Sequence, residues 1–132
     1  MCHIELLSHE RYTGQYMKKR LYQIAFWSAI TVIMALAVTP QGVKLARHMS
    51  DKLNHFAAFL VLSYLGDRAY EKPFVSIGIC LVLFGLFIEA IQFLLPYRKF
   101  SPLDMLANIC GILLYAAIKY GVESFRGKTS AS

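Results

Sequence analysis

The chain contains long, almost uncharged apolar stretches, and these limit its possible folds more than any other feature. Residues 21–38 and 74–95 each reach the length of about 17 to 25 apolar residues that crosses a bilayer as a helix. A third stretch, residues 103–120, has no charged residue between Asp104 and Lys119. Hydrophobic residues make up 57% of the 132-residue chain, above the roughly half that is usual in soluble domains. The sequence therefore predicts transmembrane helices.

A fourth apolar stretch, residues 53–66, is too short to span a membrane alone. It reaches spanning length only if it begins near Met49, which places Asp51, Lys52 and His55 in its first turns. We predict an all-α integral membrane bundle of four transmembrane helices at about residues 21–39, 50–66, 74–95 and 102–120. Residues 20–120 form this domain, residues 1–19 are a cytoplasmic extension, and residues 121–132 are a disordered cytoplasmic tail.

The Lys and Arg residues flank the apolar stretches instead of gathering on one face. With four spans, the termini and the 67–73 loop share one side, and that side has more Lys and Arg than the other. The positive-inside rule then places both termini of this multi-pass protein in the cytoplasm. The net charge of +6 comes from basic residues that flank the helices and do not form one basic face, so we expect no nucleic-acid binding.

The N-terminal region allows two other interpretations. Lys18, Lys19 and Arg20 before an apolar run that contains Ala35 and Ala37 are also typical of a cleaved secretory signal, although the run is long for one. Met17 is an alternative start of the chain. Neither alternative changes the sidedness of the later helices.

In this topology, polar residues of three helices reach one level near the outer face. Asp51 and His55, four residues apart, lie one turn apart at the outer end of the second helix. Glu89 and Gln92 share one face of the third helix, and Asp104 and Asn108 share one face of the fourth. The connecting loop contains Arg98, Lys99 and Ser101. A carboxyl group at membrane depth costs at least about 2.5 kcal/mol, so such groups face the bundle interior and are candidates for function.

Each of these residues also has a structural interpretation. Ser101 and Asp104 fit the N-cap and third position of a helix that begins with Pro102. Gln92 and Asn108 are suited to hydrogen bonds between helices, and Arg98 is suited to pairing with Glu89 or with lipid head groups. Gly85 and Gly111 allow close helix packing.

The ordered pattern of these residues resembles the VanZ-like family. The pattern consists of Asp51-Lys52-x-x-His55, then Gly85-x-x-x-Glu89-x-x-Gln92, then Pro96-x-Arg98-x-x-Ser101-x-x-Asp104-x-x-Ala107-Asn108-x-x-Gly111. The resemblance covers about residues 20–120. It implies a bacterial inner-membrane protein with few helices, from a family named for a protein associated with resistance to the glycopeptide antibiotic teicoplanin.

The leading hypothesis is a site that binds or modifies a lipid-linked anionic component of the cell envelope, such as a phospholipid or a lipid-linked cell-wall precursor. The acid–base candidates are Glu89, His55 and Asp104. The binding candidates are Asp51, Lys52, Gln92, Arg98, Ser101 and Asn108, with phosphate held by Arg98 and the lysines. We expect no cofactor; a divalent cation held by His55, Asp51, Glu89 and Asp104 is the weaker alternative.

A competing hypothesis is a non-catalytic membrane subunit whose polar network holds the bundle together. The sequence does not decide whether the chain is an enzyme. A homo-oligomer or a partner membrane protein is compatible with either hypothesis.

Overall fold

The computed structural model of the chain describes residues 2–40, 49–98 and 101–130. These residues form four α-helices and no strand, which confirms the all-helical prediction for the described part of the chain. The helices are α1 (Cys2–Val38), α2 (Met49–Ala69), α3 (Phe74–Leu94) and α4 (Pro102–Ser130). Pro73 and Pro102 stand at the starts of α3 and α4, where a missing backbone N–H costs nothing.

Two helices are much longer than the sequence predicted, and α2 ends at Ala69 instead of residue 66. α1 begins at Cys2 instead of near residue 21, and α4 continues to Ser130 through the tail that we expected to be disordered. No proline interrupts residues 2–38 or 103–130, so nothing in the sequence forces these helices to stop. Lys119 and Glu123, one turn apart and 3.9 Å from each other, add a favourable pair where α4 continues.

Three of the helices are long and apolar enough to cross a membrane: α1 over Thr13–Val38, α3 over Phe74–Leu94 and α4 over Pro102–Lys128. α2 has 21 residues but has charged side chains near both ends, including Asp51 and Asp67. It contacts each of the other three helices. Ser63 is completely buried and Asp51, His55 and Asp67 are half-buried, so protein shields much of the polar surface of this central helix.

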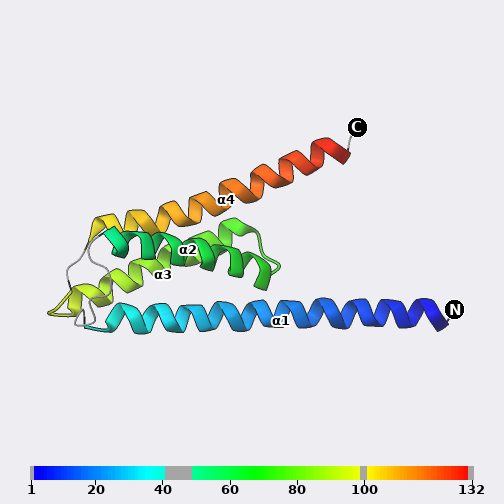
Figure 1. Cartoon of the computed structure of the whole chain (residues 1–132), viewed down its shortest axis with the longest axis horizontal. Coiled ribbons are helices and arrows are strands. Elements are labelled where there is room, and N and C mark those ends of the chain that lie inside the picture. The colour runs from blue at the N-terminus through cyan, green and yellow to red at the C-terminus, as the bar shows by residue number, and fades with distance from the viewer. Residues whose placement is uncertain (1, 41–48, 99–100, 131–132) are drawn as a thin grey trace.

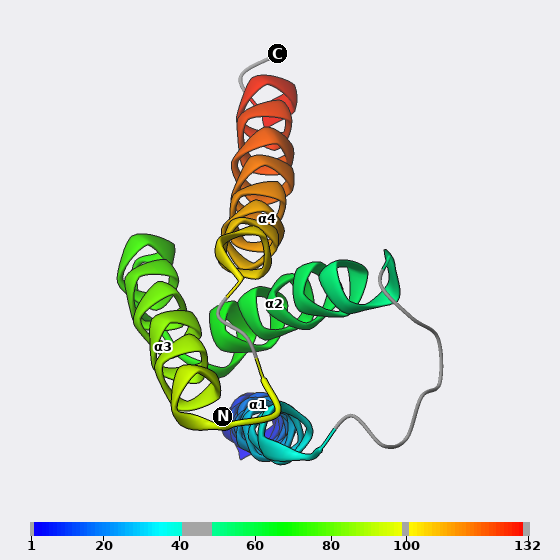
Figure 2. The ribbon, with the colours of Figure 1, turned by 90° about the vertical axis from the view of Figure 1, so that its left-hand side faces the viewer.

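Successive helices run in opposite directions, so α2 and α4 are parallel and both chain ends lie at one end of the bundle (Figure 1). α1 and α4 lie on opposite sides of the α2–α3 pair, which Figure 2 shows from the end where α3 stops and α4 begins. We call this the α3–α4 loop end, and the end that contains the α2–α3 connection the terminal end. The polar residues predicted to share one level come from elements that meet at the α3–α4 loop end.

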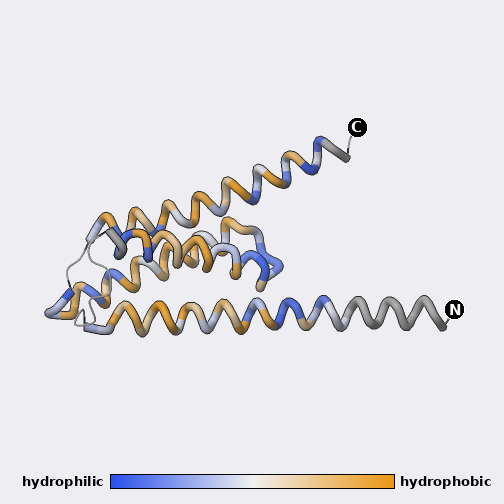
Figure 3. The backbone as a smooth tube through the Cα atoms, viewed as in Figure 1, coloured by the Kyte–Doolittle hydropathy of each residue, from blue (hydrophilic) through white to orange (hydrophobic). Residues whose placement is uncertain are grey.

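The buried core is small and most apolar side chains point outward. Phe59 and Leu62 of α2 have no exposed surface, whereas Leu83 of α3 and Leu113 of α4 expose 59% and 61% of theirs. Figure 3 shows the hydrophobic residues along the middle of the helices and hydrophilic residues around the α2–α3 connection. An apolar exterior of this extent would be unfavourable in water and is normal for helices surrounded by lipid.

Gly111 sets the distance between α2 and α4. A β-carbon at this position would lie 2.5 Å from the backbone oxygen of Phe56 and 3.0 Å from the backbone nitrogen of Leu60. The two helix backbones are therefore in direct contact at one turn. This contact brings the first turns of α2 and α4 together, and the candidate site lies beside it.

Candidate functional site

Three ionisable side chains from three helices converge at the α3–α4 loop end. One ligand atom from each of His55 of α2, Glu89 of α3 and Asp104 of α4 lies within 4.8 Å of the other two. Glu89 is 1% exposed and Asp104 is 8% exposed, whereas His55 is half-buried. These are the three acid–base candidates of the sequence, and we call them the acidic triad.

Asn108 fixes the imidazole of the acidic triad. Nδ1 of His55 lies 3.0 Å from Oδ1 of Asn108, and because this oxygen only accepts, the assignment makes Nδ1 the protonated nitrogen. Nε2 is then the ring nitrogen that remains available. Asn108 is completely buried. A β-carbon at Gly85 would lie 3.1 Å from its Nδ2, so the glycine makes room for this amide.

The start of α4 is tied to α3 through Glu89. The backbone N–H of Ser101 donates to Oε2 of Glu89 over 3.4 Å, and the backbone N–H of Asp104 donates to the carbonyl of Ser101 over 3.0 Å. Ser101 therefore lies at the N-cap, as one of the two interpretations held. The carboxylate of Glu89 occupies the place where the helix N-terminus would attract an anion.

Among the described residues, Lys52 forms an ion pair with the acidic triad. Its Nζ lies 3.8 Å from Oδ1 of Asp104, which is an ion pair too long for a hydrogen bond. The side chain of Lys52 is 40% exposed and that of Asp104 is 12% exposed. Asp51 is half-buried. The site thus has a buried acidic interior and a lysine at its edge.

Several buried polar atoms of this site have no hydrogen-bond partner among the described residues. They are Oε1 of Glu89, Oδ1 of Asp104 and Nδ2 of Asn108. Buried polar atoms are nearly always paired, and leaving one unpaired costs about 1 to 3 kcal/mol. Three such atoms close together indicate a place that is built to take up a polar ligand.

Gln92 and Arg98 do not join this site through the hydrogen bonds that the structure shows. Nε2 of Gln92 donates to the carbonyl of Ala37 over 3.3 Å, and one terminal nitrogen of Arg98 donates to the carbonyls of Leu36 and Thr39 over 3.1 and 3.3 Å. Both side chains therefore bind the C-terminal end of α1, where a cation is favoured. Arg98 and Glu89 form no ion pair in the described part of the chain, and Lys99 lies outside it.

A second polar cluster lies at the terminal end, and none of its residues was among the candidates from the sequence. The carboxylate of Asp67 accepts a hydrogen bond of 2.8 Å from the hydroxyl of Tyr115 and pairs with Lys119. The side chains of Asp67 and Lys119 are 12% and 21% exposed. Tyr115 and Lys119 are four residues apart and therefore lie on one face of α4. This spacing could have predicted an acidic partner for both residues on a neighbouring helix.

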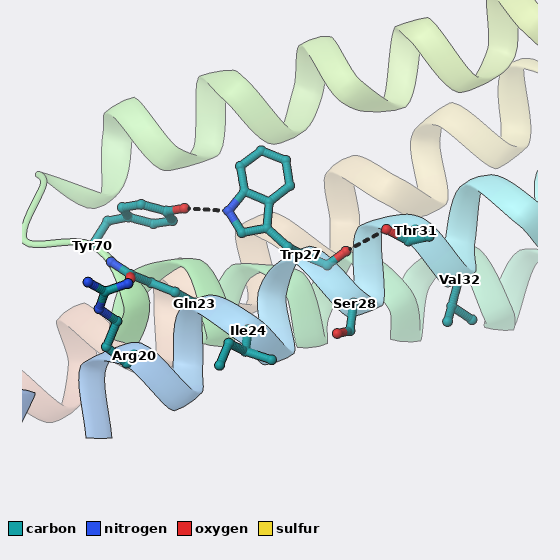
Figure 4. A pocket seen from close by; sticks show the side chains of 8 residues that line it. All are labelled: Arg20, Gln23, Ile24, Trp27, Ser28, Thr31, Val32 and Tyr70. Atoms are coloured by element: carbon teal, nitrogen blue, oxygen red, sulfur yellow. Dashed lines mark hydrogen bonds between the residues drawn. The ribbon is translucent and has the colours of Figure 1, made fainter. Parts of the chain in front are cut away.

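The surface of α1 contains a groove of about 810 Å³ near the terminal end (Figure 4). In it, Nε1 of Trp27 donates to the hydroxyl of Tyr70 over 2.9 Å. Trp and Tyr are the residues enriched where a membrane meets water. The groove is lined by Arg20, Gln23, Ile24, Trp27, Ser28, Thr31, Val32 and Tyr70, so it is separate from the acidic triad.

Comparison with known proteins identifies a family but no individual relative. Neither the curated proteins nor the solved structures include a match to this chain. The model of the VanZ/LLP1 family matches residues 5–122, a span that includes every residue of the acidic triad, all of α2 and α3, and most of α1 and α4. Together with the three helices that can cross a membrane, this match confirms the resemblance drawn from the sequence: the chain belongs to the VanZ/LLP1 family of membrane proteins.

Proposed function

We propose that this VanZ/LLP1 protein binds a lipid-linked anionic head group of the bacterial cell envelope at the acidic triad, on the outer side of the inner membrane. The observation that supports this most directly is the group of unpartnered buried atoms on Glu89, Asp104 and Asn108. A network that served only to hold the helices together would gain by pairing all of these atoms. Here each of these three side chains has one polar atom without a hydrogen-bond partner among the described residues.

The chemistry of the site favours a ligand that has both a phosphate and hydrogen-bond donors. Ionised carboxylates only accept, so Glu89 and Asp104 are suited to hydroxyl groups of a glycerol or sugar head group. Lys52, loosely paired and partly exposed at the edge, is suited to the phosphate. Phospholipids and lipid-linked cell-wall precursors share these features. His55 and Glu89 additionally provide groups for proton transfer if the bound head group is modified.

The outward position of the site depends on a four-span topology with both termini in the cytoplasm. The alternating helix directions support four crossings, and the excess of Lys and Arg on the terminal side supports this orientation. Green fluorescent protein fused after Ser132 should therefore fluoresce in bacteria, and alkaline phosphatase at the same position should be inactive. The reverse pattern would place the acidic triad on the cytoplasmic side.

The decisive substitution for the proposed function is Glu89→Gln, which removes one charge and keeps the shape. We expect the purified variant to retain at least tenfold less phosphatidylglycerol or undecaprenyl phosphate than the unaltered chain, because it loses an acceptor beside the head group. Native mass spectrometry of the protein with each lipid added in detergent measures this. The matched control is Glu123→Gln on α4, whose carboxylate is largely exposed; it should retain lipid normally.

One specific observation favours the alternative of a non-catalytic structural subunit. Gln92 and Arg98, two of the predicted binding residues, hold the end of α1. If Glu89→Gln fails to accumulate in the membrane while Glu123→Gln accumulates normally, the acidic triad also belongs to the structural network. Equal lipid retention by both variants would likewise reject the proposed function. We include a role in glycopeptide resistance in the proposal only as a consequence of binding such an envelope lipid.

A further inference from the structure

The acidic triad contains a charge conflict for any anionic ligand. Glu89 and Asp104 bring two carboxylates into a buried space, and the nearby cation Lys52 is 3.8 Å from only one of them. A phosphate that approaches this pair meets two like charges at low dielectric, where repulsion is strong. The N-terminus of α4 does not compensate, because Glu89 already accepts the Ser101 N–H. The site needs additional positive charge.

The donor atoms are of the type and number that bind a divalent cation. Glu89 and Asp104 each have a buried oxygen without a partner, and His55 has one ring nitrogen that remains available. Around an ion bound at about 2.1 Å, opposite ligand atoms are up to about 4.2 Å apart. One ligand atom from each of the three side chains lies within 4.8 Å of the other two, so closure of these side chains would bring all three onto one ion.

The surroundings of His55 match those of metal-bound histidines. A histidine that binds a metal through one nitrogen usually donates the other ring N–H to a carbonyl or carboxylate, which fixes the ring. Here Nδ1 is 3.0 Å from the amide oxygen of Asn108, a completely buried residue, and this leaves Nε2 for an ion. This bond is independent of the two carboxylates. The second observation that indicates a ligand here is the unpartnered Oε1 of Glu89, on a side chain that is 1% exposed.

We propose that His55, Glu89 and Asp104 bind one divalent cation of the Mn²⁺ class. Carboxylate oxygens suit Mg²⁺ and Mn²⁺, and the imidazole favours Mn²⁺ over Mg²⁺. Ca²⁺ prefers six to eight oxygen ligands, more than these side chains provide. Three protein ligands leave coordination positions open for a phosphate oxygen. This inference deepens the proposed function and rests on it for the identity of that phosphate, because the ion links the acidic triad to an anionic head group.

Binding of Mn²⁺ to the purified full-length chain tests the inference without any lipid. The protein is stripped with a chelator in detergent, Mn²⁺ is titrated in, and free Mn²⁺ is measured by electron paramagnetic resonance. We expect one ion per chain, with affinity lowered at least tenfold by Asp104→Asn and unchanged by Glu123→Gln. His55→Gln is a second variant that should lower the affinity for Mn²⁺. Only variants that elute as a single folded species in size-exclusion chromatography are measured.

Retention of phosphatidylglycerol in the chelated and Mn²⁺-loaded states separates this inference from the proposed function. Lipid retention that rises on Mn²⁺ loading supports both. One Mn²⁺ per chain with no lipid in either state supports the ion site and rejects the proposed function. Absence of site-specific Mn²⁺ binding, or equal affinity in the unaltered chain and Asp104→Asn, overturns the inference, and lipid retained in the chelated state then leaves the proposed function in place.

Discussion

Gly111→Ala should strongly destabilise the protein, although it adds a single methyl group. The new carbon would lie 2.5 Å from the oxygen of Phe56 and 3.0 Å from the nitrogen of Leu60, and both are backbone atoms of α2. No side-chain rotation relieves this overlap, so α2 and α4 must separate. Overpacking of this kind costs about 3 kcal/mol, roughly a hundredfold in the folding equilibrium.

The cost should appear as a lower melting temperature in detergent and a smaller yield of monodisperse protein. Gly121→Ala and Gly78→Ala are matched controls. A β-carbon at Gly121 meets nothing within 4 Å, and one at Gly78 approaches a side-chain carbon of Ile112 to only 3.6 Å. Both should be neutral, or should gain up to about 1 kcal/mol from the better helix propensity of Ala. A Gly111→Ala variant as stable as these two would contradict the close contact of α2 and α4.

Asp67→Leu should destabilise the terminal end of the bundle by about 3 kcal/mol. The substitution leaves the ammonium of Lys119 without its carboxylate partner on α2, and it leaves the hydroxyl of Tyr115 without its acceptor. The unpaired lysine should cost about 2 kcal/mol, which is less than the usual cost of breaking a buried ion pair because its side chain is 21% exposed. The unpaired hydroxyl should cost about 1 kcal/mol.

A double substitution distinguishes this mechanism from simple loss of packing. In Asp67→Leu combined with Lys119→Leu, no charge of the pair remains buried, so most of the loss should be recovered. Melting temperatures of the two single variants and the double variant, measured in the same detergent, give the coupling. If the effects of the two substitutions simply add, Asp67 and Lys119 do not depend on each other.

The expectation that polar residues of three helices share one level came from signals local to each helix. The four-residue spacing of Asp104 and Asn108 put both on one face, and both are buried together with Glu89. The cost of a carboxylate in a membrane identified Glu89 as a residue facing protein. Which side chains then meet across helices depends on helix rotation and packing distance, and only the structure shows that His55 pairs with Asn108.

The predictions for the ends of α1 were incomplete for a similar reason. Arg98 looked like an anion ligand because guanidinium groups bind phosphate, yet the carbonyls at the end of α1 are competing acceptors that no side-chain pattern displays. The Asp67 cluster was missed because Asp67 lies beyond the apolar part of its helix. The tail was expected to be disordered because chain ends often are, whereas α4 continues to Ser130.

The central position of α2 has a consequence for how the chain enters the membrane. α2 is the helix with least to gain from lipid and most to gain from its neighbours, since both of its polar ends find their partners on α4. Those partners, Asn108 and Tyr115, are synthesised about fifty residues later. α2 is therefore held stably in the bilayer only after α4 has been synthesised and has packed against it.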